Sequence, residues 1–220
     1  MAIGRRLQNS PARLIAAVVI GLSVVIADLA LSWWRTNYGG LENGRGTVAI
    51  LGLVALVWLC EGDLAAVGLR IRPVQGWCCW IGWGLRIGLA VAACIAVGVG
   101  IGLGMGFVPP IHTTPPGRIG WALLGMCLIA PVLEETVYRL ALCLPITAAI
   151  GPRTAIVVSG FVFGALHVVY GNPSPENLVG GFFLAWAYLK SQSLLMPVLL
   201  HSLGNLCALA AQVAAWFWFG

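Results

Sequence analysis

Charged residues are scarce in this sequence. They make up 9% of its 220 residues, whereas a soluble domain usually contains about 25%. Hydrophobic residues make up 60%, and the mean hydropathy is +0.96. So few charged residues are not enough to form the polar surface of a separate soluble domain. We therefore predict an integral membrane protein that forms one domain over residues 1–220, with the lipid bilayer as its surroundings.

The basic residues form no cluster that would suit nucleic acid. The net charge of +5 comes from residues scattered at the ends of apolar runs, which is the pattern that membrane topology produces. We therefore expect no nucleic-acid partner.

Sequence motifs of several common catalytic and metal sites are also missing. The seven cysteines include no C-x-x-C pair, and their number is odd, which argues against a disulfide framework or a cysteine zinc site. The zinc-protease motif H-E-x-x-H is absent. Ser159 lies near His167 in the sequence but has no G-x-S-x-G context. Neither a serine nucleophile nor that zinc chemistry is predicted.

The apolar runs predict an all-α polytopic membrane helix bundle with about seven or eight transmembrane helices. A spanning helix needs roughly 20 apolar residues. The basic residues before the first run favour an uncleaved first helix with the N-terminus on the cytoplasmic side. The abundance of Gly, Ala, Trp and Arg is typical of bacterial proteins, so we expect a bacterial inner (plasma) membrane. The predicted runs are 14–34, 47–60, 77–107, 119–149, 154–170, 178–189 and 194–219.

A few polar residues interrupt these runs. A charged side chain in the bilayer costs roughly 2.5–3.5 kcal/mol on insertion scales, so such residues indicate function by default. A lone histidine or a single Glu–Arg pair could still be structural. The residues concerned are Glu134, Glu135 and Arg139 on one predicted helix, His167 on the next, and His201 and Asn205 on the last.

Their spacing predicts a catalytic arrangement. Residues four apart share a helix face, so Glu135 can pair with Arg139. Glu134 is rotated by about 100° from its neighbour and can face elsewhere. The predicted cavity is lined by Glu134, His167, His201 and Asn205. A carboxylate there can deprotonate a water, and His201 and Asn205 can donate hydrogen bonds to the oxyanion of an amide under attack.

Three motifs occur in a fixed order: E-E-x-x-x-R from Glu134 to Arg139, F-x-x-x-H from Phe163 to His167, and H-x-x-x-N from His201 to Asn205. This order resembles the CPBP family of CAAX prenyl endopeptidase-like and bacteriocin-processing proteins, described as glutamic-type intramembrane proteases. The motif core covers residues 119–208.

The resemblance implies a role for each motif residue. Glu134 would activate water with the help of His167, and His201 and Asn205 would form the oxyanion hole. Glu135 and Arg139 would support the site, and Phe163 would pack beneath it. The implied substrate is a membrane-anchored protein or peptide, cut near its membrane-associated, C-terminal end, and no cofactor is required.

Three alternatives stay open. The chain could be a non-catalytic scaffold or bacteriocin-immunity protein with the same fold. It could be a small transporter in which Glu and His relay protons, although a continuous polar path is not evident. Zinc could also be bound by Glu134, His167 and His201.

Overall fold

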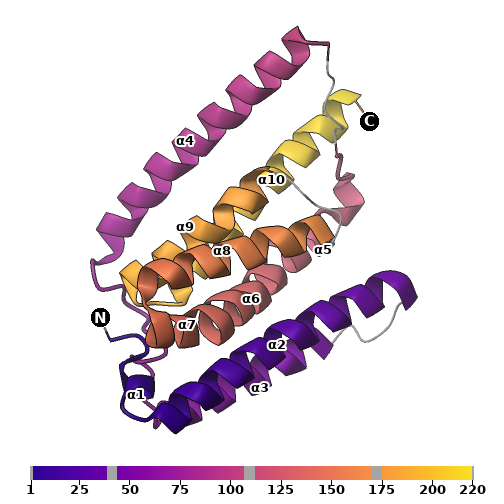
Figure 1. Cartoon of the computed structure of the whole chain (residues 1–220). Coiled ribbons are helices and arrows are strands. Elements are labelled where there is room, and N and C mark those ends of the chain that lie inside the picture. Colours follow the sequence, from indigo (N-terminus) through magenta and orange to yellow (C-terminus); the bar gives the residue numbers. More distant parts are fainter. Residues whose placement is uncertain (1, 39–43, 107–111, 170–174, 220) are drawn as a thin grey trace. The chain divides into compact units, whose positions relative to one another are not determined.

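Helices form the regular structure of the computed structural model in Figure 1, which describes residues 2–38, 44–106, 112–169 and 175–219. Within these ranges no β-strand occurs, apart from an isolated bridge between Leu69 and Ser193. The predicted all-α class is confirmed. In chain order the elements are α1 (Arg5–Gln8), α2 (Pro11–Tyr38), α3 (Gly44–Leu59), α4 (Trp77–Gly104), η1 (Pro116–Arg118), α5 (Ile119–Ala122), η2 (Leu123–Ile129), α6 (Ala130–Glu135), η3 (Thr136–Cys143), α7 (Leu144–Ile150), α8 (Pro152–Val169), α9 (Pro175–Ser191) and α10 (Leu195–Phe219).

Several helices have the length and composition of membrane spans, as predicted. Among the described residues there are five: Pro11–Trp34, Trp77–Gly104, Pro116–Ile150, Pro152–Val169 and Leu195–Trp218. The seven or eight predicted helices include shorter ones that this measure of length does not count. The remaining long helices, α3 and α9, have only 16 and 17 residues, fewer than the roughly 20 that a straight span requires. Three predicted connections, around residues 39–43, 107–111 and 170–174, lie outside the described residues.

The chain divides into two compact units, each built from two separate stretches of sequence. The first contains Met1–Val74 and Val132–Val198, and the second contains Gln75–Pro131 and Leu199–Gly220. Each is described here by itself. The single-domain organisation stays a prediction.

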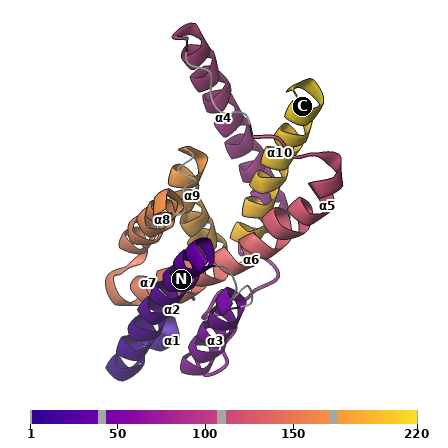
Figure 2. The same ribbon diagram turned by 90° about the vertical axis from the view of Figure 1, so that its right-hand side faces the viewer.

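In the first unit, α2 lies along α3, and both pack against η3 (Figures 1 and 2). Two glycines allow this close approach. A Cβ on Gly21 would lie 2.2 Å from the carbonyl oxygen of Ala141, and a Cβ on Gly52 would lie 2.6 Å from Val24. Small residues let helix backbones approach closely where lipid, not water, is the solvent.

The α8 and α9 helices form a second close pair in this unit (Figure 2). A Cβ on Gly181 would lie 2.8 Å from the carbonyl oxygen of Gly160, and a Cβ on Gly160 would lie 2.9 Å from the Cα of Phe182. Gly160 and Gly164 are spaced as in small-xxx-small packing motifs. This contact fixes α8, the helix that carries Phe163 and His167.

In the second unit, the segment before η1 is tied to α10. The backbone N–H and the hydroxyl of Thr114 bond to the backbone and side chain of Gln212, at 3.2 and 2.8 Å. The α4 helix has a largely exposed apolar surface, of which Leu89 and Ile101 are examples. Such a surface suits lipid contact.

Candidate active site

The two glutamates end a short α-helix, α6, between two π-helical segments, η2 and η3. The wider register is visible at the ends of these segments, where the N–H of Ala130 bonds to Gly125 and that of Leu144 bonds to Arg139. Each segment is followed closely by a proline, Pro131 or Pro145, which cannot donate a backbone hydrogen bond. π-Helical turns are rare and are frequent at functional sites.

Glu135 and Arg139 form the predicted pair within this helix. Arg139 Nε lies 2.7 Å and Nη2 lies 3.3 Å from the two carboxylate oxygens of Glu135, and both side chains are fully buried. Arg139 Nη1 also donates to Ser159 Oγ at 3.0 Å, and Ser159 donates to the carbonyl of Tyr138 at 2.9 Å. The guanidinium lies 4.8 Å from the ring centre of Phe163. This side of the helix is closed and fully hydrogen-bonded around its charges, which suits the predicted supporting role.

Glu134 points to a different environment. Its Oε2 lies 3.9 Å from His167 Nε2, and the two side chains keep 16% and 13% of their surface accessible. That separation is longer than a hydrogen bond, and Oε2 itself is buried although the Glu134 side chain as a whole is partly accessible. The structure thus brings together the predicted catalytic carboxylate and one predicted imidazole.

The other nitrogen of His167 is held by its own helix. Nδ1 lies 2.9 Å from the carbonyl oxygen of Phe163. A carbonyl can only accept, so Nδ1 carries a proton and donates it to Phe163, which leaves Nε2 on the side of Glu134. The rings of Phe163 and His167 also contact each other, with centres 4.3 Å apart. Phe163 therefore orients the imidazole through both its backbone and its side chain.

Asn205 has a partner in the second unit. Its Nδ2 donates to the carbonyl oxygen of Met126 at 2.7 Å. The register of η2 explains this bond. The N–H of Ala130 bonds to the carbonyl of Gly125, five residues back, and in the same register residue 131 would bond to the carbonyl of Met126. Residue 131 is a proline and has no N–H, so this carbonyl has no backbone donor. The asparagine side chain supplies the missing donor. The side-chain amide nitrogen of asparagine carries two hydrogens, so the second can donate another hydrogen bond.

His201 lies one helical turn before Asn205 in α10 and is partly buried. Glu134 and His167 belong to the first compact unit, whereas His201 and Asn205 belong to the second. The common cavity therefore stays a prediction, as do the catalytic roles.

Three residues of the first unit lie outside the predicted site but form a polar cluster, namely Asp28, Arg45 and Tyr138. Asp28 of α2 is 1% exposed and accepts hydrogen bonds from Arg45 of α3 and Tyr138 of η3. Asp28 is the one acid of the first apolar run, and by the rule applied to Glu134 it should have been a candidate. Arg45 falls between the predicted apolar runs 14–34 and 47–60.

Among the described residues, no group of three or more His, Cys, Asp and Glu side chains is arranged to hold a metal ion. The zinc alternative is therefore left to experiment.

Comparison with known families bears on these motifs. Residues 116–207 match the model of the family described as type II CAAX prenyl endopeptidase Rce1-like. This segment is similar to that family. It contains all three motifs, and the family predicted from them is confirmed over this stretch. The comparisons found no match among curated proteins and none among solved structures.

The Rce1-like match and the apolar helices support the general assignment of an intramembrane protease of the CAAX type. The bilayer as its surroundings follows from the same findings. The mechanism, the substrate and the orientation in the membrane are matters of proposal.

Proposed function

We propose that the chain is an intramembrane endopeptidase of the glutamic type. The observation that carries the proposal is the placement of the Glu134 carboxylate 3.9 Å from the Nε2 of His167, whose Nδ1 is held by a backbone carbonyl. A carboxylate and an oriented imidazole on a partly accessible face are the parts that water activation needs.

In the proposed reaction, Glu134 accepts a proton from a water that His167 helps to hold. The resulting hydroxide adds to the carbonyl carbon of the scissile amide and forms a tetrahedral oxyanion. Glu134 then passes its proton to the amide nitrogen, and the carbon–nitrogen bond breaks. The products are a carboxylic acid and an amine, which exchange a proton to become a carboxylate and an ammonium ion, and the glutamate is returned to its starting state.

His201 and Asn205 are proposed to donate hydrogen bonds to the oxyanion. Removing one such donor typically costs about 10²–10³ in turnover. The Asn205 amide can serve in this way with the N–H that Met126 does not use. Glu135, Arg139 and Phe163 support the site, and no cofactor is required.

The proposed substrate is a membrane-anchored protein or peptide, cut near its membrane-associated, C-terminal end. We further propose that the chain lies in a bacterial inner membrane with its N-terminus in the cytoplasm. The basic residues Arg5, Arg6 and Arg13 beside the first span support that orientation.

The test is a comparison of membrane and secreted fractions from cells that carry the wild-type protein or Glu134→Gln. We expect a fragment from a membrane-anchored protein to disappear in the variant. Glu176→Gln, the same change at an exposed glutamate at the start of α9, is the matched control and should leave the fragment in place.

Two of the alternatives give different results in these tests. A scaffold or immunity protein would act equally well with Glu134→Gln. A zinc enzyme would lose activity on chelation, with stoichiometric zinc in the purified protein. A glutamic protease keeps its activity after chelation.

A further inference from the structure

A polar cluster in the first unit joins three helices behind the candidate site. Asp28 of α2 accepts hydrogen bonds from Arg45 of α3, Nε to Oδ1 at 2.6 Å and Nη2 to Oδ2 at 3.1 Å. The hydroxyl of Tyr138 donates to the same carboxylate at 3.1 Å. Asp28 is 1% exposed, and the Arg45 side chain is 16% accessible. We call these three residues the Asp28 cluster.

The cluster reaches His167 through aromatic contacts. The Tyr138 ring meets Phe163 edge-on, with centres 5.3 Å apart and planes at 90°. Phe163 in turn contacts the His167 ring and accepts the hydrogen bond from its Nδ1. A fixed Tyr138 therefore limits the positions that Phe163 and the imidazole can take.

The α3 helix, which carries Arg45, also packs close to the residue that precedes Glu134. A Cβ on Gly46, the residue after Arg45, would lie 3.8 Å from the Leu133 side chain, and Leu133 precedes Glu134. Arg45 also lies within electrostatic range of Glu134. The charge of Arg45, oriented by Asp28, thus lies on the α3 side of the carboxylate, while His167 lies on the α8 side.

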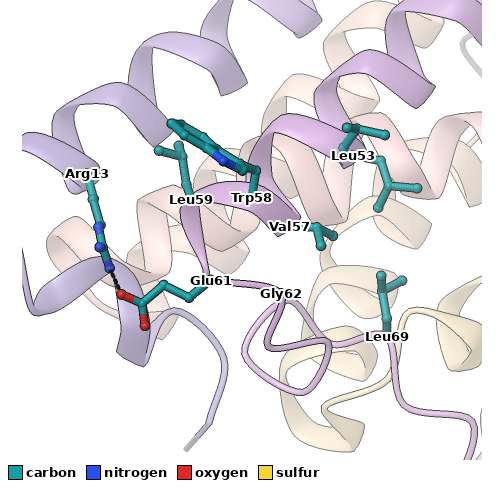
Figure 3. A pocket seen from close by; sticks show the side chains of 9 residues that line it. Arg13, Leu53, Val57, Trp58, Leu59, Glu61, Gly62 and Leu69 are labelled. Atoms are coloured by element: carbon teal, nitrogen blue, oxygen red, sulfur yellow. Dashed lines mark hydrogen bonds and ion pairs between the residues drawn. The ribbon is translucent and has the colours of Figure 1, made fainter.

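A purely structural role would not require this placement. Buried ion pairs add little net stability, since desolvation offsets most of the attraction. The same pair of helices carries a second ion-paired contact at its other end, between Arg13 and Glu61 (Figure 3). A connection between α2 and the end of α3 therefore exists without the Asp28 cluster.

We propose that the Asp28 cluster is a positioning element for the candidate catalytic pair. Asp28 holds Arg45 within electrostatic range of Glu134, and Tyr138 holds Phe163 and with it the ring of His167. This inference rests on the proposed function, because it assigns the cluster to the reaction at Glu134. None of the three residues touches the scissile bond.

The test uses full-length protein purified in detergent, with turnover of a fluorogenic peptide calculated per folded molecule. Arg45→Gln should lower kcat by about tenfold, equal to roughly 1.4 kcal/mol, with KM nearly unchanged. Tyr138→Phe, which removes one hydroxyl, should give a smaller loss of kcat. Arg13→Gln breaks the ion pair at the other end of the same helices and should leave both constants as in the wild type.

A spectroscopic readout separates positioning from stability. The sequence has three histidines, so ¹⁵N-histidine labelling gives few imidazole signals, and His167→Asn identifies that of His167. Tyr138→Phe should shift the His167 signal, whereas Arg13→Gln should not. Wild-type kcat per folded molecule in Arg45→Gln, or an unmoved His167 signal in Tyr138→Phe, would overturn the positioning role.

The failure of this inference differs from that of the proposed function. If the protein cleaves, Glu134→Gln is inactive and Arg45→Gln is fully active, only the positioning role is wrong. If Glu134→Gln cleaves normally, the proposed function itself is wrong.

Discussion

The two sides of the helix formed by α6 and η3 carry adjacent glutamates in opposite surroundings. On the closed side, Glu135 and Arg139 are fully buried, and Ser159 satisfies a further N–H of the guanidinium. On the open side, Glu134 and His167 keep 16% and 13% of their surface and lie 3.9 Å apart. A rotation of about 100° per residue thus separates a fully buried, ion-paired carboxylate from a partly accessible one.

The comparison has a physical basis in the cost of burial. A charge that is removed from water must be paired and hydrogen-bonded, so a carboxylate that is satisfied on all sides has little left to offer a substrate. A carboxylate for acid–base work needs access to water and a neighbour that orients it. On the open side Glu134 is partly accessible beside His167, whereas on the closed side Glu135 is held by Arg139 but is fully buried.

The largest effect is expected from Glu134→Gln. This change keeps the shape of the side chain but removes the base, so peptide cleavage should fall to background while thermal unfolding stays close to that of the wild type. Kinetics and thermal unfolding of purified protein, with Glu176→Gln as the control, check both parts. Normal cleavage by Glu134→Gln would break the comparison.

The second effect is on the closed side. Arg139→Ala leaves the Glu135 carboxylate buried without its cation, and the loss of one partner of a buried pair typically costs about 3–5 kcal/mol of folding free energy. We expect a lower yield and a large drop in the unfolding temperature. Any protein that does fold should keep measurable turnover. A stable but inactive Arg139→Ala would instead assign Arg139 to the chemistry.

The third test asks whether the second unit contributes to the open side. If Asn205 donates to the oxyanion, Asn205→Ala should lower kcat and kcat/KM together by about 10²–10³, with KM nearly unchanged. If its hydrogen bond to Met126 is its only role, the variant should lose stability alone. Turnover per folded molecule separates these outcomes, and wild-type turnover would remove Asn205 from the proposed mechanism.

A smaller change on the closed side is Ser159→Ala. It removes a hydrogen bond to a charged group, a type of interaction that contributes about 1.5–3 kcal/mol. We expect a moderate drop in unfolding temperature, clearly smaller than that of Arg139→Ala, and unchanged kcat per folded molecule. A drop as large as that of Arg139→Ala would mean that Ser159 carries the stability of the whole closed side.

Local spacing explains which parts of the site the sequence could predict. The Glu135–Arg139 pair follows from helix geometry alone, because residues four apart on one helix meet. The class of the fold follows equally directly from the apolar runs. Both inferences need no knowledge of what lies opposite.

Contacts between distant segments were beyond that reasoning. The bond between Asp28 and Arg45 joins two helices across a loop, and periodicity says nothing about the pairing. The acceptor of Asn205 depends on the π-helical register before Pro131. In that register the carbonyl left without a backbone donor by Pro131 is that of Met126, five residues back, whereas in an α-helix it would be the carbonyl four residues back. A register of this kind has no signature in an apolar sequence.

The smallest effect is expected where an ion pair is exposed. Arg13 and Glu61 are paired at 39% and 47% side-chain accessibility (Figure 3), and solvent and salt screen such pairs. The hydrogen bond and the charge of Arg13 lower the pKa of Glu61 below its ordinary value of 4.5. A carboxylate whose pKa is lower in the folded state stabilises the fold above the unfolded pKa and loses that contribution as pH falls through the folded one. Arg13→Gln should therefore change the unfolding temperature slightly at pH 7, and less in high salt or below pH 4.5.

Thermal unfolding at two salt concentrations and two pH values, with Arg139→Ala measured alongside, provides the check. A drop that matched Arg139→Ala and persisted in salt would show that exposure does not separate the two ion pairs.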